Sequence, residues 1–129
     1  MNNPPKILII DDDTQLSDLF YTKLTAENFI GLKAFNGKEG LEVAKKEKPD
    51  LILLDLKMPI MDGSETLAQL HADKETSAIP VFILSSFNDW SAIKMTPETA
   101  KALGAKDFFE KGIDLNLLIQ KIKGVLKLI

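Results

Sequence analysis

Aspartates stand directly after two short apolar runs, and carboxylates in such places can do chemistry. Asp11 and Asp12 follow the run Lys6–Ile10 (KILII), and Asp55 follows the run 51–54 (LILL). A short apolar run without alternation is typical of a strand buried on both faces. A carboxylate at its end is costly to bury unless a proton or a cation compensates its charge. Taken alone, the second run is equally consistent with a strand that ends in a solvated aspartate.

Two further polar residues follow later apolar runs. Ser85 comes after the run 79–84, and Lys111 comes shortly after the run 106–109. In a parallel sheet the carboxyl ends of all strands share one edge, where ligands bind. If the strands before Asp11 and Asp55 are neighbours, their carboxylates converge, and such a cluster of hard oxygens suits Mg²⁺. A hydroxyl and an ammonium beside a metal-bound carboxylate could hold a phosphoryl group.

Strands and helices alternate along the whole chain. We expect strands at 6–10, 31–35, 51–54, 79–84 and 106–109, and helices at 14–28, 38–48, about 62–71, 96–104 and from Asp114 to the C-terminus. This alternation predicts parallel βαβ units with right-handed crossovers and helices on both faces of the sheet. No repeat, linker or low-complexity tract interrupts it, so residues 1–129 are expected to form a single α/β domain.

Several of the expected helices carry recognisable features. Leu16, Leu19, Phe20 and Leu24 are spaced to form one apolar face of the first helix. Asp62 and Asp114 can cap the helices that follow them. The short helix opens on Thr96-Pro97-Glu98, with proline in its first turn.

Composition excludes several functional classes. The 129 residues are 45% apolar and 27% charged, with a formal net charge of −3, which argues against a basic face for direct contact with nucleic acid. The absence of cysteine rules out disulfides, thiolate nucleophiles and cysteine-bound zinc, and one histidine rules out a multi-histidine metal site. No apolar run is long enough to span a membrane, and the first five residues are too short and polar for a signal peptide. A cytoplasmic protein is therefore expected.

The pattern of these residues resembles the response-regulator receiver domain of two-component signalling. The resemblance covers essentially the whole chain, and the positions that carry it are Asp11-Asp12, Asp55, Met58-Pro59, Asp62-Gly63, Ser85 and Lys111. It implies a doubly wound, flavodoxin-like fold with five parallel strands in the order 2-1-3-4-5, flanked by five helices. This strand order is taken from the family, which is a standard example of it, and does not follow from spacing.

The resemblance also implies a role for each matching residue. Asp55 would accept a phosphoryl group from a histidine kinase, a phosphotransfer protein or a small phosphodonor. Asp11, Asp12 and Asp55 would hold Mg²⁺, with the backbone carbonyl of Lys57 as a further ligand. Ser85 and Lys111 would contact the transferred group, so the chain would catalyse only its own phosphorylation and dephosphorylation.

A switch residue and an output face are implied as well. Phe108 matches the aromatic position whose rotamer follows phosphorylation. The output would be a population shift in the face built from the short helix, the strand 106–109 and the final helix, which would contact a downstream protein.

Simpler explanations exist for each of these residues. Asp12 and Asp13 could merely begin a helix, where acids favour the helix dipole, and we assign Asp13 that role. Lys111 could be a solvated loop lysine, and Ser85 a strand-end hydroxyl bonded to backbone. Phe108 is expected to pack in the core whether or not it also switches.

Three features depart from the usual family pattern. Gly112 stands where the family usually has proline, which would permit a looser loop around Lys111. Phe108 replaces the more common tyrosine and so lacks a hydroxyl for partner contacts. The segment between Ser86 and Thr96, which contains Trp90, looks a few residues longer than usual.

Three other functions were considered. A degenerate receiver that acts only as a docking module would fit if the acids did not bind Mg²⁺. A haloacid-dehalogenase-like phosphatase would need a second acid two residues after Asp55, where this chain has Lys57. A flavodoxin-like flavin protein would need a phosphate loop after the first strand, where the acids would repel phosphate.

The final helix carries more apolar residues than one buried face requires. Leu115, Leu117 and Leu128 are the surplus, and some of them should be exposed in an isolated domain. We therefore expect this face to contact a partner or a second copy of the chain.

Overall fold

The structure is a computed structural model that describes residues 3–58, 61–86 and 96–128. Its strands are β1 (Lys6–Ile10), β2 (Ile30–Ala34), β3 (Leu51–Asp55), β4 (Val81–Ser85) and β5 (Asp107–Glu110). Its helices are α1 (Thr14–Ala26), α2 (Gly37–Glu47), α3 (Gly63–Ala72), α5 (Pro97–Ala102) and α6 (Leu115–Val125). All strand pairs are parallel, and their order is β2-β1-β3-β4-β5. The α/β class and the strand order expected from the family are therefore confirmed.

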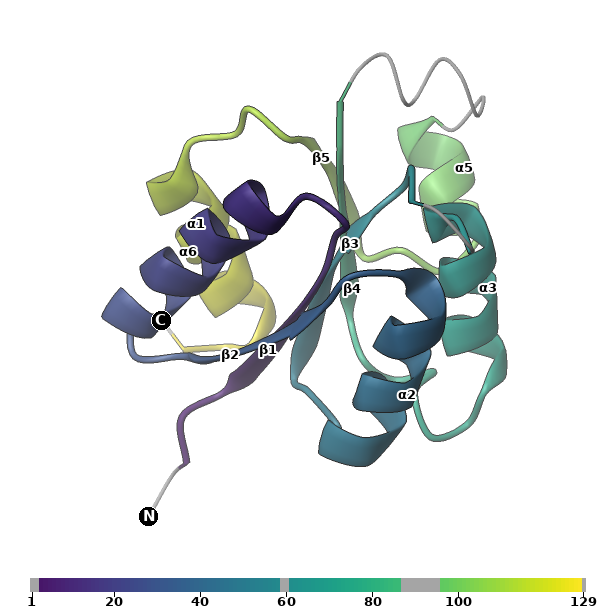
Figure 1. Cartoon of the computed structure of the whole chain (residues 1–129), viewed down its shortest axis with the longest axis horizontal. Coiled ribbons are helices and arrows are strands. Elements are labelled where there is room, and N and C mark those ends of the chain that lie inside the picture. Colours follow the sequence, from purple (N-terminus) through teal and green to yellow (C-terminus); the bar gives the residue numbers. More distant parts are fainter. Residues whose placement is uncertain (1–2, 59–60, 87–95, 129) are drawn as a thin grey trace.

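The helices cover both faces of the sheet. Figure 1 shows α1 and α6 on one face, and α2, α3 and α5 on the other. Because successive side chains of a strand point to opposite faces, each strand feeds two cores. In β1, Leu8 and Ile10 pack in the core on the α2, α3 and α5 side, whereas Ile7 and Ile9 pack in the core beside α1 and α6. This double burial explains why the central strands are continuously apolar.

The register brings the carboxyl ends of the strands level with one another. Ile10 pairs with Leu54, so the residues after them, Asp11 and Asp55, leave neighbouring strands at the same height. The backbone N–H of Asp11 donates to the carbonyl of Ala34 at 3.0 Å, which extends the contact with β2 by one residue. This backbone hydrogen bond therefore positions Asp11 independently of any ligand.

Several predicted boundaries were wrong by a few residues. β4 begins at Val81, two residues later than expected, although the carbonyl of Pro80 still accepts from the Ile52 N–H at 3.0 Å. The final helix ends at Val125 and does not run to the C-terminus. It stops there because Lys127 adopts a left-handed conformation (φ 59°) that a helix cannot continue.

The predicted apolar face of α1 was also partly wrong. Phe20 and Leu24 are buried and Leu16 packs partly against the core, but Leu19 is 51% exposed.

The sequence also predicted an unusually long segment between Ser86 and Thr96. That segment, residues 87–95 with Trp90, lies outside the described residues. Within the described part of the chain, no helix is long and apolar enough to cross a membrane.

Candidate functional site

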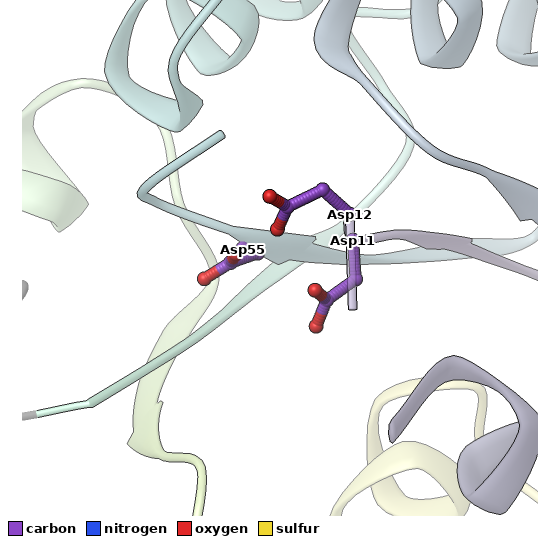
Figure 2. Close-up of side chains that lie close together, drawn as sticks. All are labelled: Asp11, Asp12 and Asp55. Atoms are coloured by element: carbon purple, nitrogen blue, oxygen red, sulfur yellow. The ribbon is translucent and has the colours of Figure 1, made fainter. Parts of the chain in front are cut away.

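Three aspartates lie together at the carboxyl ends of β1 and β3. One carboxylate oxygen from each of Asp11, Asp12 and Asp55 lies within 4.8 Å of the others. Figure 2 shows the three side chains close together. Asp11 is 3% exposed and Asp55 is 2% exposed, whereas Asp12 lies at the surface. The sequence-based expectation that these acids converge is thus confirmed in position.

The aspartates in the turn after β1 make different contacts. The Asp13 side chain caps α1 by accepting from the Leu16 N–H at 3.0 Å. The Asp13 N–H in turn donates to Oδ1 of Asp11 at 2.9 Å and so orients that carboxylate. Asp13 is therefore the helix-start residue, while Asp11 and Asp12 contribute oxygens to the cluster.

Lys111 brings a positive charge to the same cluster. Its Nζ atom lies 3.4 Å from Oδ2 of Asp11 and 3.3 Å from Oδ1 of Asp55. The Lys111 N–H donates to the Ser85 carbonyl at 3.1 Å, so β4 holds the lysine backbone at the edge of the site. Gly112, in the family's proline position, does not prevent this placement, and the alternative of a solvated loop lysine is excluded by the two ion pairs.

The electrostatics of the site reflect a surplus of negative charge. Burial raises the pKa of Asp55 from 3.8 to about 7, with a further increase from Asp11 and an opposing effect of Lys111. Burial also raises the pKa of Asp11, although the Asp13 N–H and Lys111 partly offset this. For Lys111, burial favours the neutral form, but the charges of Asp55 and Asp11 outweigh it and raise the pKa of the ammonium. One lysine therefore does not neutralise the acids.

The residues present fit a hard divalent cation. Oδ1 of Asp55 is fully buried and accepts no hydrogen bond from a described residue, although Lys111 forms an ion pair with it. Burial of such a charged oxygen costs free energy unless a further positive group approaches it. Carboxylate oxygens at this spacing, one of them exposed to solvent, match the preference of Mg²⁺ for few protein ligands and several waters.

Gly63 packs against the end of β3, the strand that carries Asp55, and the sequence pattern did not predict this contact. Its N–H donates to the Leu56 carbonyl at 2.6 Å. A Cβ atom at Gly63 would lie 2.3 Å from the Asp55 carbonyl oxygen and 2.5 Å from Cα of Leu56. Asp62 caps α3 through the Glu65 N–H at 2.9 Å, as predicted. The start of α3 therefore packs directly on the backbone of Asp55 and Leu56, which only a residue without a side chain allows.

The remaining predicted residues lie around this centre or beneath it. Ser85 is the buried last residue of β4 and pairs with Glu110 of β5. Phe108 is 8% exposed and packs in the core on the side of α2, α3 and α5, which confirms its packing role. Lys57 is exposed two residues after Asp55. The use of its carbonyl as a metal ligand stays a prediction.

Comparisons with known proteins agree with this geometry. Residues 7–123 match the family model described as response regulator receiver domain. The chain belongs to this family. A related receiver protein is PilH of Pseudomonas aeruginosa, which is 37% identical over 94% of this chain and 97% of its own length. Sporulation initiation phosphotransferase F of Bacillus subtilis is 34% identical over 95% of this chain and 94% of its own.

Solved structures support the same assignment of this receiver domain. A CheY-like response regulator receiver domain protein from Methanospirillum hungatei superimposes with a TM-score of 0.82. It is 28% identical, and the match covers 96% of this chain and 94% of that one. The receiver fold is therefore shared along nearly the full length of both chains.

Proposed function

We propose that this receiver domain is a magnesium-dependent phosphoacceptor in which Asp55 takes a phosphoryl group from a histidine kinase, a phosphotransfer protein or a small phosphodonor. The observation that carries this proposal is the buried Asp55 carboxylate, whose Oδ1 accepts no hydrogen bond within the described part of the chain and lies 3.3 Å from Nζ of Lys111. A nucleophile placed between a lysine and two further acids is suited to receive a highly charged group.

The reaction follows from the residues around Asp55. One of its carboxylate oxygens forms a bond to the phosphorus of the donor while the bond to the leaving group breaks. A histidine leaving group takes up a proton from solvent, whereas acetate leaves as the anion. Lys111 stabilises the developing charge on the phosphoryl oxygens by its ammonium. A bound Mg²⁺ would neutralise further charge on those oxygens, and Asp11, Asp12, Asp55 and the Lys57 carbonyl are the groups that would hold it.

The proposed output begins at the neighbouring strand ends. The Ser85 hydroxyl, at the end of β4, is suited to bind the phosphoryl group after transfer. Phe108 lies two residues before Glu110, the partner of Ser85 in β5, so a shift of Ser85 can be transmitted to its ring. The face of α5, β5 and α6 would then change its preferred conformation and contact a downstream protein. We place this switch in the cytoplasm, and we propose that the domain transforms no other substrate.

Mass spectrometry of the intact protein tests the central step. Incubation with acetyl phosphate and Mg²⁺ should add one phosphoryl mass to the wild type and none to Asp55→Asn. Asp18→Asn is the matched control, because Asp18 is an exposed acid of α1 outside the cluster and should leave labelling unchanged. Labelling of Asp55→Asn, or labelling that persists in excess chelator, would contradict the proposal.

A second measurement separates a slow phosphoacceptor from a docking module. Beryllofluoride with Mg²⁺ mimics the phosphorylated aspartate and should bind tightly even if acetyl phosphate reacts slowly. Failure of both reagents would favour a domain that only docks.

We also propose that the apolar residues of α6 and the segment after it contact a partner or a second copy. Leu117 is 44% exposed and Leu128 is 48% exposed, while Leu115 packs partly against the core beside α1. Analytical ultracentrifugation with and without beryllofluoride tests self-association. A monomer at high concentration in both states would exclude it.

A further inference from the structure

A cavity lies at the edge of the sheet opposite the acidic site. It has a volume of about 620 Å³ and includes Pro80, which precedes β4, and Lys106, which precedes β5. His71 at the end of α3 and Gly124 at the end of α6 also line it. Its size falls in the range of small-molecule sites. Because it sits at the amino ends of the strands, it is separate from the site around Asp55.

The charged residues that line this cavity are all basic. Lys101, Lys106 and Lys127 contribute to its walls, and none of the described lining residues is acidic. The side-chain ammonium groups of these three lysines form no ion pair or hydrogen bond with another described residue. The cavity is thus a local concentration of positive charge on a protein whose formal net charge is −3.

Capping of helix ends does not account for these lysines. Basic residues often lie near helix C-termini because they offset the negative end of the dipole. Here the backbone closes both helix ends: the Ala105 N–H donates to the Ala100 carbonyl at 2.9 Å, and the Leu128 N–H donates to the Lys123 carbonyl at 2.8 Å. Such bonds satisfy carbonyls that the helices leave unpaired, so the ammonium groups are available to a ligand.

The cavity also has an apolar wall. Ile79, Pro80 and Val125 line it together with the lysines. A ligand that matches both features carries phosphate groups on one side and a planar or apolar body on the other. We propose that this cavity binds a small organic phosphate of the nucleotide class, with its phosphates between the lysines and its base against the apolar wall.

Titration with ADP, followed by NMR of the full-length protein, tests this site. The experiment is done without divalent metal, because the acids around Asp55 then repel phosphates from the opposite edge of the sheet. We expect saturable shifts at the backbone amides of Gly104, Lys106 and Gly124. ADP should bind more tightly than pyrophosphate or adenosine, since each of these supplies only half of the contacts. Absence of saturable shifts at these amides would overturn the proposal.

Matched variants distinguish a built site from general attraction of anions. The double variant Lys101→Gln/Lys106→Gln should weaken ADP binding at least about tenfold, through loss of two charge-assisted contacts. Lys38→Gln/Lys46→Gln is the control, because these exposed lysines of α2 make no ion pair with a described residue and the net charge changes equally. Equal weakening by both double variants would show nonspecific attraction and would overturn the proposal.

Gly124 offers a second test that leaves every lysine in place. A Cβ atom there would meet nothing within 4 Å, so the fold can accept a side chain at this position of α6. Gly124→Glu should weaken ADP binding by adding a negative charge beside the cavity, whereas the isosteric Gly124→Gln should bind more tightly than the glutamate variant. Identical affinities would contradict an electrostatic role for the cavity.

Further measurements test this inference independently of the phosphoacceptor proposal and distinguish ADP from an acidic protein ligand. Asp55→Asn should bind ADP as the wild type does, and Lys101→Gln/Lys106→Gln should still be labelled by acetyl phosphate. A hexaglutamate peptide should bind more weakly than ADP, because it has no base to pack on the apolar wall. If the peptide binds equally well, the organic phosphate assignment is wrong, and an acidic protein segment is the better occupant.

Discussion

The Nζ atom of Lys111 lies 3.3 Å from Oδ1 of Asp55, a buried oxygen that accepts no hydrogen bond from the residues that the structure describes. The two residues are far apart in the sequence and meet because β3 and β5 both flank β4. The ion pair stabilises the ionised form of Asp55 in a site from which water is largely excluded. It also places a cation where an oxygen of a transferred phosphoryl group would lie.

Replacement of Lys111 by methionine should therefore impair the site without unfolding the domain. We expect the rate of labelling by acetyl phosphate to fall at least about tenfold, because charge on the transferred oxygens loses a stabilising cation. The pKa of Asp55 should also rise further above about 7, since Lys111 opposes the increase caused by burial and Asp11. NMR titration of the Asp55 carboxyl measures this shift. Lys121→Met, at an exposed position of α6, is the control and should change neither quantity.

The raised pKa of Asp55 predicts how stability depends on pH in metal-free protein. Asp55 titrates near 7 in the folded state and near 3.8 in the unfolded chain, so the folded protein holds a proton that the unfolded chain has released. The stabilisation from this group is full below about pH 4 and is lost as the pH rises through about 7. Between pH 5 and pH 8 this loss should reach roughly 2.5 kcal/mol.

Urea unfolding of Asp55→Asn tests this pH dependence. The variant should be more stable than the wild type at pH 8, and the difference should shrink at pH 5, where the folded wild type is already protonated. Parallel stability profiles for the two proteins would show that Asp55 does not titrate as described.

Asp12 and Asp13 are adjacent, but their substitution should have different effects on thermal stability and on stabilisation by Mg²⁺. Asp12→Ala should weaken the thermal stabilisation that Mg²⁺ gives, because it removes one of the three clustered carboxylates. Asp13→Ala should lower stability by about 1 kcal/mol through loss of the α1 cap but keep the response to Mg²⁺. Thermal unfolding with and without Mg²⁺ measures both effects. A normal magnesium response in Asp12→Ala would argue against its role as a ligand.

Gly63→Ala should disturb both stability and phosphorylation. The new Cβ atom would lie 2.3 Å from the Asp55 carbonyl oxygen, so the start of α3 and the end of β3 must move apart. We expect a loss of about 1–3 kcal/mol and slower labelling of Asp55, measured by urea unfolding and by intact mass. Gly124→Ala is the matched control: its Cβ atom meets nothing within 4 Å, and alanine should stabilise α6 by up to about 1 kcal/mol. Wild-type labelling in Gly63→Ala would show that the close approach does not position Asp55.

Local sequence patterns predicted much of this architecture. The continuous apolar runs predicted strands buried on both faces, and the capping residues Asp62, Thr96 and Asp114 predicted where three helices begin. The resemblance to receiver domains then supplied the strand order and the set of site residues. Local patterns failed at Leu19, which has helical spacing but faces solvent, because spacing alone does not say how wide the buried stripe of a helix is.

Local burial patterns specify the strands and helices of this protein and the polar residues at the carboxyl ends of its strands, because burial imposes a periodicity on each short segment. The choice of neighbouring strands, the position of the Lys111 ammonium and the close approach of Gly63 to Asp55 arise only on folding. Folding also forms the basic cavity from the ends of α3, α5 and α6. These relationships join residues distant in the chain, and they depend on register and helix packing, which no short segment encodes.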